Sequence, residues 1–317
     1  MSATLRGGVD VGGTKIQAVV TNRGGKVVGE ARRGTPREGG PEQVADDIAL
    51  AITEAATSAG VRVRELRSIG IGVPGSVDRD AGLVLKAANI EGWGEPYAIG
   101  PVLGERLGVP VAVGNDVSVA VEAERRFGAG RGTRSFLGVF WGTGIGAGLV
   151  LDGRQVEGRG SAGELGHMCV KPGGRRCACG LRGCVEAYAG RGSLEERAKR
   201  EARKRKTVLF ELAEKRERET LTSGIWVRAL EAKDAVATAL VEEAVAALGV
   251  AIGSAVNLLD VELVIVGGGL GERLGPAWLE QLEKAAARHT FFSPPPRYAL
   301  AALGDQGGAI GASLLSP

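Results

Sequence analysis

The residues with the clearest potential for chemistry form one short block in the middle of the chain. His167 is followed by Cys177, Cys179 and Cys184 with the spacing His-x9-Cys-x-Cys-x4-Cys. One imidazole and three thiolates are the ligand set that a structural Zn²⁺ prefers, and the glycines of CACG and LRGC allow the chain to wrap tightly. The alternative is a cluster of free thiols. The pattern favours a structural zinc site in the loop 167–184.

A fourth cysteine and two acidic residues accompany this block. Cys169 is expected to pack as a small buried apolar side chain rather than to bind metal. Glu164 and Glu186 would suit the hydroxyl groups of a sugar as hydrogen-bond acceptors beside a loop held by a metal. As surface carboxylates, they would need no such explanation.

Three glycine-rich turns are expected at strand ends: DVGGTK (10–15), WGTGIGAG (141–148) and VGGGLG (266–271). Backbone amides without a neighbouring Cβ can approach a polyphosphate closely. The first turn is no Walker A loop, since Thr14 precedes Lys15. The second matches a dinucleotide fingerprint only superficially, because it joins two predicted strands where the fingerprint requires a strand and a helix. Each turn alone could be a tight hairpin without a ligand, but together they favour phosphate binding.

Asn115 and Asp116 follow a short apolar strand and precede a predicted helix. This is the place where α/β sheets present catalytic groups. An aspartate there could accept a proton from a substrate hydroxyl, which is the task of the base in phosphoryl transfer. It could equally cap the helix. Position alone does not decide between these roles.

The elements that must position these groups read as an alternation of strands and helices. Strands are expected near 8–11, 16–21 and 26–32, then a helix at 41–59 and a strand at 68–73. From residue 134 the pattern restarts, with the strand SFLGVF, a glycine turn and one returning strand, GLVLDGRQV. Two such hairpins suggest a duplicated α/β architecture with a cleft between its halves. The predicted domains are 1–116 plus about 303–317, and 117–302.

Composition and charge exclude several classes of protein. The 52 glycines come with only 12 prolines and no Gly-X-Y period, so the chain is not collagen-like. The segment 195–220 carries ten basic against seven acidic residues and accounts for the net charge of +3, so a nucleic-acid footprint is not expected. This segment is either a solvated helix, which is favoured, or a basic arm for a partner. No apolar run approaches a membrane span and no secretory signal is evident, which predicts a cytoplasmic protein.

The block GELGHMCVKPGGRRCACGLRGCVE, with DVGGTK before it and VIVGGGLG after it, resembles the ROK family of sugar kinases and regulators. The resemblance spans nearly the whole chain. It implies an α/β fold of the actin-like, hexokinase-type (ribonuclease H-like) class, with two domains and ATP in the cleft between them. It also implies a homodimer or homotetramer. The charge distribution and the lack of an apolar span predict no nucleic-acid and no membrane partner.

The resemblance also implies a role for each candidate residue. Asp116 would be the catalytic base that takes the proton from the sugar's primary hydroxyl, while one nitrogen of His167 would bind Zn²⁺ and the other a sugar hydroxyl. The residues expected to bind the sugar, besides Asp116, are Asn89, Asn115, Glu164, His167 and Glu186. The residues expected to bind the nucleotide are Asp10 (near Mg²⁺), Gly12, Gly13, Thr14, Lys15, Gly142, Thr143, Gly144, Gly267, Gly268 and Gly269.

The activity that the resemblance implies is that of an ATP-dependent glucokinase, which transfers the γ-phosphoryl group of ATP to the 6-hydroxyl of glucose. Fructose, mannose and N-acetylmannosamine stay open as sugars, and polyphosphate as a donor. A sugar-sensing regulator without catalysis is a further alternative, but its helix-turn-helix would have to precede a first strand that begins near residue 8. Two departures from the family pattern are Trp141 before the second turn and the length of the charged segment 195–220.

Overall fold

The computed structural model describes residues 4–87, 90, 92–291 and 293–316, and the chain divides into two compact units. The first unit comprises Met1–Arg131, Glu157–Ala162 and Asp305–Pro317, and the second comprises Gly132–Val156 and Gly163–Gly304. This division differs from the expected boundary after residue 116. The helix α3 (Asp116–Phe127) stays with the first unit because it packs against the C-terminal helix α11 (Gly307–Ala312).

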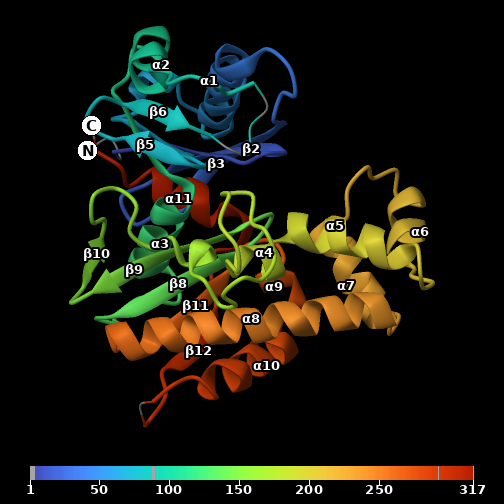
Figure 1. Cartoon of the computed structure of the whole chain (residues 1–317). Coiled ribbons are helices and arrows are strands. Elements are labelled where there is room, and N and C mark those ends of the chain that lie inside the picture. Colours follow the sequence, from blue (N-terminus) through green and yellow to red (C-terminus); the bar gives the residue numbers. More distant parts are fainter. Residues whose placement is uncertain (1–3, 88–89, 91, 292, 317) are drawn as a thin grey trace. The chain divides into compact units, whose positions relative to one another are not determined.

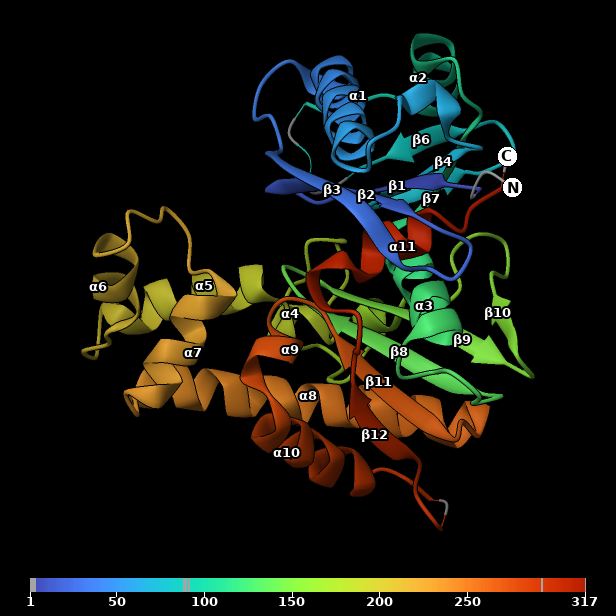
Figure 2. The same cartoon turned by 180° about the vertical axis from the view of Figure 1, so that it is seen from behind.

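The first unit is built on a five-stranded sheet with the order β3-β2-β1-β4-β7. Its strands are β1 (Arg6–Val11), β2 (Lys15–Thr21), β3 (Val27–Gly34), β4 (Ile69–Val73) and β7 (Val111–Asn115). The first three form an antiparallel meander, whereas β4 and β7 run parallel to β1. Helices α1 (Gly40–Ser58) and α2 (Ile99–Leu107) cover one face, and α3 and α11 cover the other (Figures 1 and 2). A short helix η1 (Val63–Glu65) and a hairpin of β5 (Ser76–Asp78) and β6 (Leu83–Lys86) complete this unit.

Two strand glycines let α11 lie directly on the first sheet. A Cβ on Gly8 would stand 1.9 Å from the carbonyl oxygen of Ala309, and one on Gly70 would stand 1.8 Å from that of Ala312. Part of the glycine surplus thus serves close packing between helix and sheet rather than turns. The segment just before α11 is thereby held beside the end of β1.

The second unit repeats the arrangement with the strand order β10-β9-β8-β11-β12. Its strands are β8 (Phe136–Trp141), β9 (Ile145–Leu151), β10 (Arg154–Val156), β11 (Leu263–Gly267) and β12 (Arg297–Leu300). The β8–β9 hairpin corresponds to β1–β2, and β11 pairs parallel to β8 as β4 does to β1. The expected single strand GLVLDGRQV is wrong. It is broken into β9 and β10 by Asp152 and Gly153, whose φ angles of 50° and 76° form a tight hairpin turn.

Helices pack around the second sheet, and the longest of them is α8 (Ala235–Leu259). By length and composition, α8 could cross a membrane, contrary to the expectation that no segment approaches such a span. It packs against α10 and other helices of this unit, and 61% of its most apolar window is buried, as in the core helix of a folded unit. The remaining helices are η2 (Leu165–His167), α4 (Glu186–Ala189), α5 (Arg191–Ala202), α6 (Leu209–Glu214), α7 (Ser223–Glu231), α9 (Gly271–Leu274), α10 (Pro276–Ala287) and η3 (Gly304–Gln306).

Candidate functional site

In the first unit, the candidate residues gather at the carboxyl ends of the parallel strands. Asp10 near the end of β1 pairs with Gly72 of β4, and Gly72 pairs with Gly114 of β7. Asn115 and Asp116 follow Gly114 directly, and the first glycine turn follows β1. The parallel register therefore brings the expected phosphate turn and the expected base to one edge of the sheet.

The capping role at the start of α3 belongs to Asn115. Its side-chain oxygen accepts a hydrogen bond from the backbone N–H of Ser118 at 3.0 Å, while its amide nitrogen donates to the carbonyl of Gly75 at 3.1 Å. Asp116 is instead the first residue of the helix, and its Oδ1 accepts from the N–H of Val117 at 2.9 Å. Asp116 therefore lies in the first turn of α3, a part of a helix where acidic side chains are favoured.

Asp10 lies in a crowded and electrically negative environment. Burial, and then the neighbouring Asp116, raise its pKa to about 7, and Asp305 adds to this while Lys15 opposes it. A Cβ on Gly308 would stand 2.7 Å from the Asp10 Cγ, so α11 covers the carboxyl group closely. Lys15 Nζ pairs with Asp305 Oδ1 at 3.2 Å. A divalent cation beside Asp10 would lower the free-energy cost of ionising its carboxyl group. Mg²⁺ prefers oxygen ligands and therefore fits a carboxylate here.

We expect Asp10→Asn to stabilise the metal-free protein increasingly as the pH rises. The unfolded state loses the Asp10 proton near pH 3.8, whereas the folded state keeps it until about pH 7, so the wild type loses stability through this window. The advantage of Asp10→Asn should grow by about 2 kcal/mol between pH 5.5 and pH 8. Urea unfolding without Mg²⁺ at both pH values measures it. An advantage that did not change with pH would contradict this account of Asp10.

In the second unit, two glycine turns meet at the ends of β8 and β11. Leu270, just after β11, donates its backbone N–H to the carbonyl of Trp141 at 2.9 Å. Gly268 has a φ of 84°, and a Cβ there would stand 2.7 Å from the backbone nitrogen of Trp141. Trp141 itself is 2% exposed and donates its indole N–H to Ala189 at 2.7 Å, so this departure from the family pattern is a core residue.

The turn 142–144 is held by hydrogen bonds with the first residues of α4 and α5. Glu186 Oε2 accepts from the backbone N–H of Ile145 at 2.8 Å, so one oxygen of this predicted sugar ligand is used in holding the turn. Arg191 donates from Nη2 to the Thr143 hydroxyl at 2.8 Å, and its backbone N–H bonds to the Gly142 carbonyl. The turn is thus held in a defined shape.

A Cβ at Gly144 would stand 2.4 Å from Glu186 Oε2, so Gly144→Ala should displace this carboxylate from the Ile145 N–H. We expect a loss of about 1–3 kcal/mol in the free energy of unfolding. Gly142→Ala is the matched control for stability, because a Cβ there meets no atom within 4 Å. Urea denaturation of both variants makes the comparison. Equal stability of the two would overturn the supporting role of Glu186.

The four predicted metal ligands converge in the second unit. The ligand atoms of His167, Cys177, Cys179 and Cys184 all lie within 4.8 Å of one another. Cys177 Sγ is 3.8 Å from His167 Nδ1, and Cys179 Sγ is 3.7 Å from Cys184 Sγ. Tetrahedral Zn²⁺ with Zn–S bonds of about 2.3 Å places its sulfur ligands roughly 3.8 Å apart, so this donor set fits zinc.

The two ring nitrogens of His167 face different groups. Nδ1 faces the cysteine cluster, while Nε2 lies 3.8 Å from Glu164 Oε2. A metal on Nδ1 would fix the proton on Nε2, which could then donate to a ligand. Glu164 is exposed and lies one turn before His167, so both groups are presented together.

Cys169 is exposed, and the expectation that it is buried is wrong. The segment 168–170 is extended and pairs with 183–185, with hydrogen bonds from Val170 to Gly183 and from Val185 to Met168. Met168 and Val170 pack against the core, so the alternation of an extended chain turns Cys169 outward. It stays outside the set of four ligands.

Two further residues belong to these surroundings and were not predicted: Arg191, which holds Thr143, and Asp305, which pairs with Lys15. Their partners lie far away in the sequence, and no local spacing signals the contacts. Asn89, predicted to bind sugar, lies outside the described residues.

Comparison with known proteins agrees with this architecture. The model of the ROK family matches residues 6–317. A glucokinase from Halalkalibacterium halodurans is 31% identical, covering 97% of this chain and 93% of the relative, and an N-acetyl-D-glucosamine kinase from Pectobacterium atrosepticum is 31% identical over 97% of each. The crystal structure of a ROK family glucokinase from Streptomyces griseus, in complex with glucose and AMPPNP, has a TM-score of 0.82 and 32% identity, covering 98% of both chains.

The chain belongs to the ROK family. Its fold is that of the actin-like sugar kinases, as the resemblance in the sequence implied. It is a sugar phosphotransferase.

Proposed function

We propose that this sugar kinase is an ATP-dependent glucokinase, which transfers the γ-phosphoryl group of ATP to the 6-hydroxyl of glucose. The observation that carries the proposal is the placement of Asp116. Asn115 caps α3, so the Asp116 carboxylate is not needed as the cap and stands at the sheet edge that also holds the first glycine turn. The glucokinase relatives at this level of identity support glucose as the sugar.

In the proposed reaction, Asp116 accepts the proton of the 6-hydroxyl as the sugar oxygen attacks the γ-phosphorus of ATP, the bond from that phosphorus to the β–γ bridging oxygen breaks, and ADP leaves. The backbone N–H groups of the turns 12–14 and 142–144 hold the phosphates, with Lys15 beside the first turn, and Gly267–Gly269 lie next to the adenosine. Catalysis then rests mainly on positioning and electrostatic stabilisation. Asp10 would hold Mg²⁺, which neutralises charge on the phosphates when bound.

The proposed metal at His167, Cys177, Cys179 and Cys184 is a structural Zn²⁺. All four ligands would be used, so it leaves no open position for a substrate. Its contribution is to fix the direction of the His167 ring, so that Nε2 donates to a sugar hydroxyl next to Glu164. Asn89, Asn115 and the free oxygen of Glu186 are the other proposed sugar contacts.

We further propose a cytoplasmic enzyme that assembles as a homodimer or homotetramer, with sugar and ATP as its small-molecule partners. The expected division into two domains, with boundaries at about residues 116 and 303, is kept as a proposal for the parts that move on sugar binding, with α3 moving together with the first part because it packs against α11. Closure of such parts would exclude water from the transferring phosphoryl group.

The test is an ADP-release assay on zinc-loaded enzyme across glucose, mannose, fructose, N-acetylglucosamine and N-acetylmannosamine, with ATP or polyphosphate as donor. The proposal expects the highest kcat/KM for glucose with ATP. A higher value for N-acetylglucosamine would instead assign the activity of the Pectobacterium atrosepticum relative. Turnover with no sugar on the panel would overturn the kinase assignment.

A further inference from the structure

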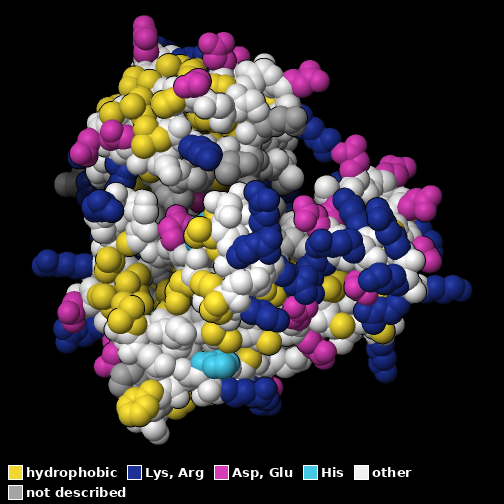
Figure 3. Space-filling model, viewed as in Figure 1, with side chains coloured by type: hydrophobic (Ala, Val, Ile, Leu, Met, Phe, Trp, Pro, Cys, Tyr) yellow, Lys and Arg dark blue, Asp and Glu magenta, His cyan; other side chains and the backbone are white. Residues whose placement is uncertain are grey.

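The basic side chains of the charged segment 195–220 fall into two groups with different surroundings. On α5 and just after it, Arg197, Lys199 and Arg205 form ion pairs with Glu243, Glu195 and Glu201. The other basic residues of this part are exposed: Arg200, Arg203, Lys204 and Lys206. The second group lies between α6 and α7. Figure 3 shows Lys and Arg side chains gathered over the region of α5–α7.

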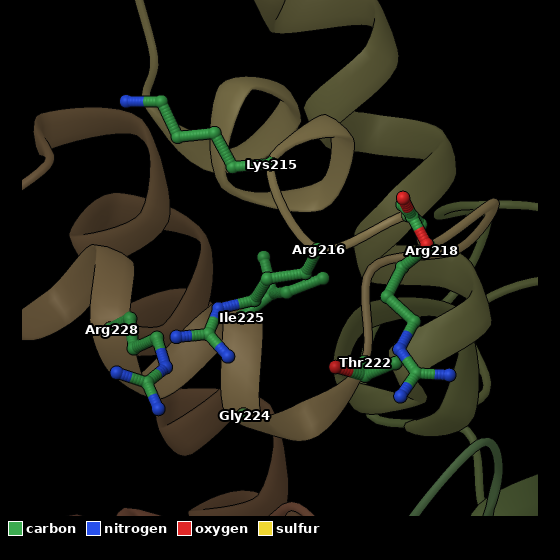
Figure 4. A pocket seen from close by; sticks show the side chains of 8 residues that line it. Lys215, Arg216, Arg218, Thr222, Gly224, Ile225 and Arg228 are labelled. Carbon is green, nitrogen blue, oxygen red and sulfur yellow. The ribbon is translucent and has the colours of Figure 1, made fainter.

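This second group lines a surface pocket of about 460 Å³. The four cationic residues of the basic pocket are Lys215, Arg216, Arg218 and Arg228. Glu217 is the single acid in the lining, and Thr222, Gly224 and Ile225 complete it. Figure 4 shows the side chains of Arg216, from the α6–α7 loop, and Arg228, from α7, on one side of the pocket, Arg218 on the other side beside Thr222, and Lys215 extending away from them. Within the described part of the chain, none of these four side chains has an ion pair or a hydrogen bond with protein.

The loop that carries these cations has a defined conformation. The carbonyl of Ala213 accepts the backbone N–H groups of both Arg216 and Arg218, at 3.1 and 3.0 Å. At the other end, the buried Glu195 carboxylate accepts the N–H of Leu221 at 2.9 Å. The backbone beneath the side chains is therefore anchored at both ends. A bound anion would add negative charge beside these exposed cations.

We propose that the basic pocket binds a small metabolite that carries two or more phosphoryl groups. Planar guanidinium groups match phosphate oxygens in pairs, and three arginines offer several such forks. A phosphoryl group carries about −1.5 to −2 charges at neutral pH, so two of them match four cations and one carboxylate. A volume of this size is typical of small-molecule sites. This site is distinct from the glycine turns of the proposed kinase reaction.

A hydrogen-bonded connection leads from the pocket to the second glycine turn. Arg191 donates from Nη1 to the carbonyl of Leu221 at 3.0 Å, and from Nη2 to the Thr143 hydroxyl at 2.8 Å. One guanidinium thus bridges the end of the α6–α7 loop and the turn 142–144. Ordering the loop by an anion should therefore also protect the turn.

The experiment titrates inorganic pyrophosphate into the zinc-loaded protein by calorimetry, without Mg²⁺ and without nucleotide, and compares the wild type with variants of the basic pocket. We expect Arg216→Ala/Arg228→Ala to weaken binding at least tenfold. The control Arg154→Ala/Arg288→Ala removes two exposed arginines outside the pocket and should leave binding unchanged. Arg218→Gln is titrated with pyrophosphate in the same way, so that the test does not depend on the double variant folding correctly. Hydrogen exchange with pyrophosphate should slow at 215–228 and at 142–144.

Three results would overturn the proposal that the pocket binds paired phosphoryl groups, and a fourth would overturn only the connection to the glycine turn. Equal weakening by the control variant would show binding to net charge alone. Equal affinity for sulfate and pyrophosphate would mean that the pocket does not select paired phosphoryl groups. Binding of a duplex oligonucleotide or of anionic vesicles through the same arginines, without binding of pyrophosphate, would assign the surface to a macromolecular partner. Protection at 215–228 without protection at 142–144 would overturn the connection through Arg191.

Discussion

Asp116→Asn is expected to lower kcat for glucose by about 10²–10⁴-fold, which is the range for loss of a positioned general base. The amide has nearly the same shape but cannot take the proton of the sugar hydroxyl. Its oxygen can still accept the N–H of Val117, so the start of α3 should be unchanged. Asn115 continues to cap that helix. The loss should therefore appear in kcat, with the Kd for glucose within a few-fold of wild type.

The measurement combines steady-state ADP release with calorimetric titration of glucose. Asp80→Asn is the matched control, since it makes the same chemical change at an exposed position of the first unit. Normal turnover of Asp116→Asn would refute the base assignment. A parallel loss of glucose binding and of folding would mean that Asp116 serves the architecture of the sheet edge instead.

Cys184→Ser is expected to remove the proposed zinc and with it the order of the loop that bears His167. Cys184 is fully buried, and burial raises the pKa of its thiol to about 12, so a metal has to displace this proton when it binds. Serine fills nearly the same space but does not supply a soft anionic ligand. We expect less than one zinc per chain, a clearly lower Tm and at least tenfold weaker glucose binding, equivalent to about 1.4 kcal/mol.

Cys169→Ser is the matched control for this prediction, because Cys169 is exposed and lies outside the ligand set. Elemental analysis, thermal unfolding and glucose titration should all be close to wild type for it. If Cys184→Ser bound glucose with normal affinity while lacking zinc, the metal would have no part in positioning His167 and Glu164. If both variants lost zinc equally, the ligand set itself would be wrong.

Features with a local signal could be predicted from the sequence. The metal ligands lie within eighteen residues, from His167 to Cys184, so their spacing alone indicated a common site, and the structure brings their ligand atoms together. The paired hairpins followed from repeated strand patterns around glycine turns. The family block then supplied the actin-like fold, which composition and periodicity could not have distinguished from other α/β architectures.

Other features depend on tertiary contacts and could not be predicted in this way. The pairing of Lys15 with Asp305 joins the two ends of the chain, and the bond from Arg191 to Thr143 spans 48 residues. Cys169 was expected inside because cysteine is commonly buried, but the packing of its two neighbours turns it outward. The break between β9 and β10 at Asp152-Gly153 was missed. The residues before this turn are apolar, whereas the short strand after it, Arg154–Val156, is mostly polar, so the second strand had no clear signal of its own.

The most direct test of the account is to identify the product. The zinc-loaded enzyme is incubated with glucose, ATP and Mg²⁺, and the product is analysed by ³¹P and ¹H nuclear magnetic resonance, with Asp116→Asn in parallel. The account predicts a phosphate monoester on O6 of glucose, formed together with ADP, and formed at least a hundredfold more slowly by Asp116→Asn. Phosphorylation at another hydroxyl, or no phosphorylated sugar at all, would contradict it.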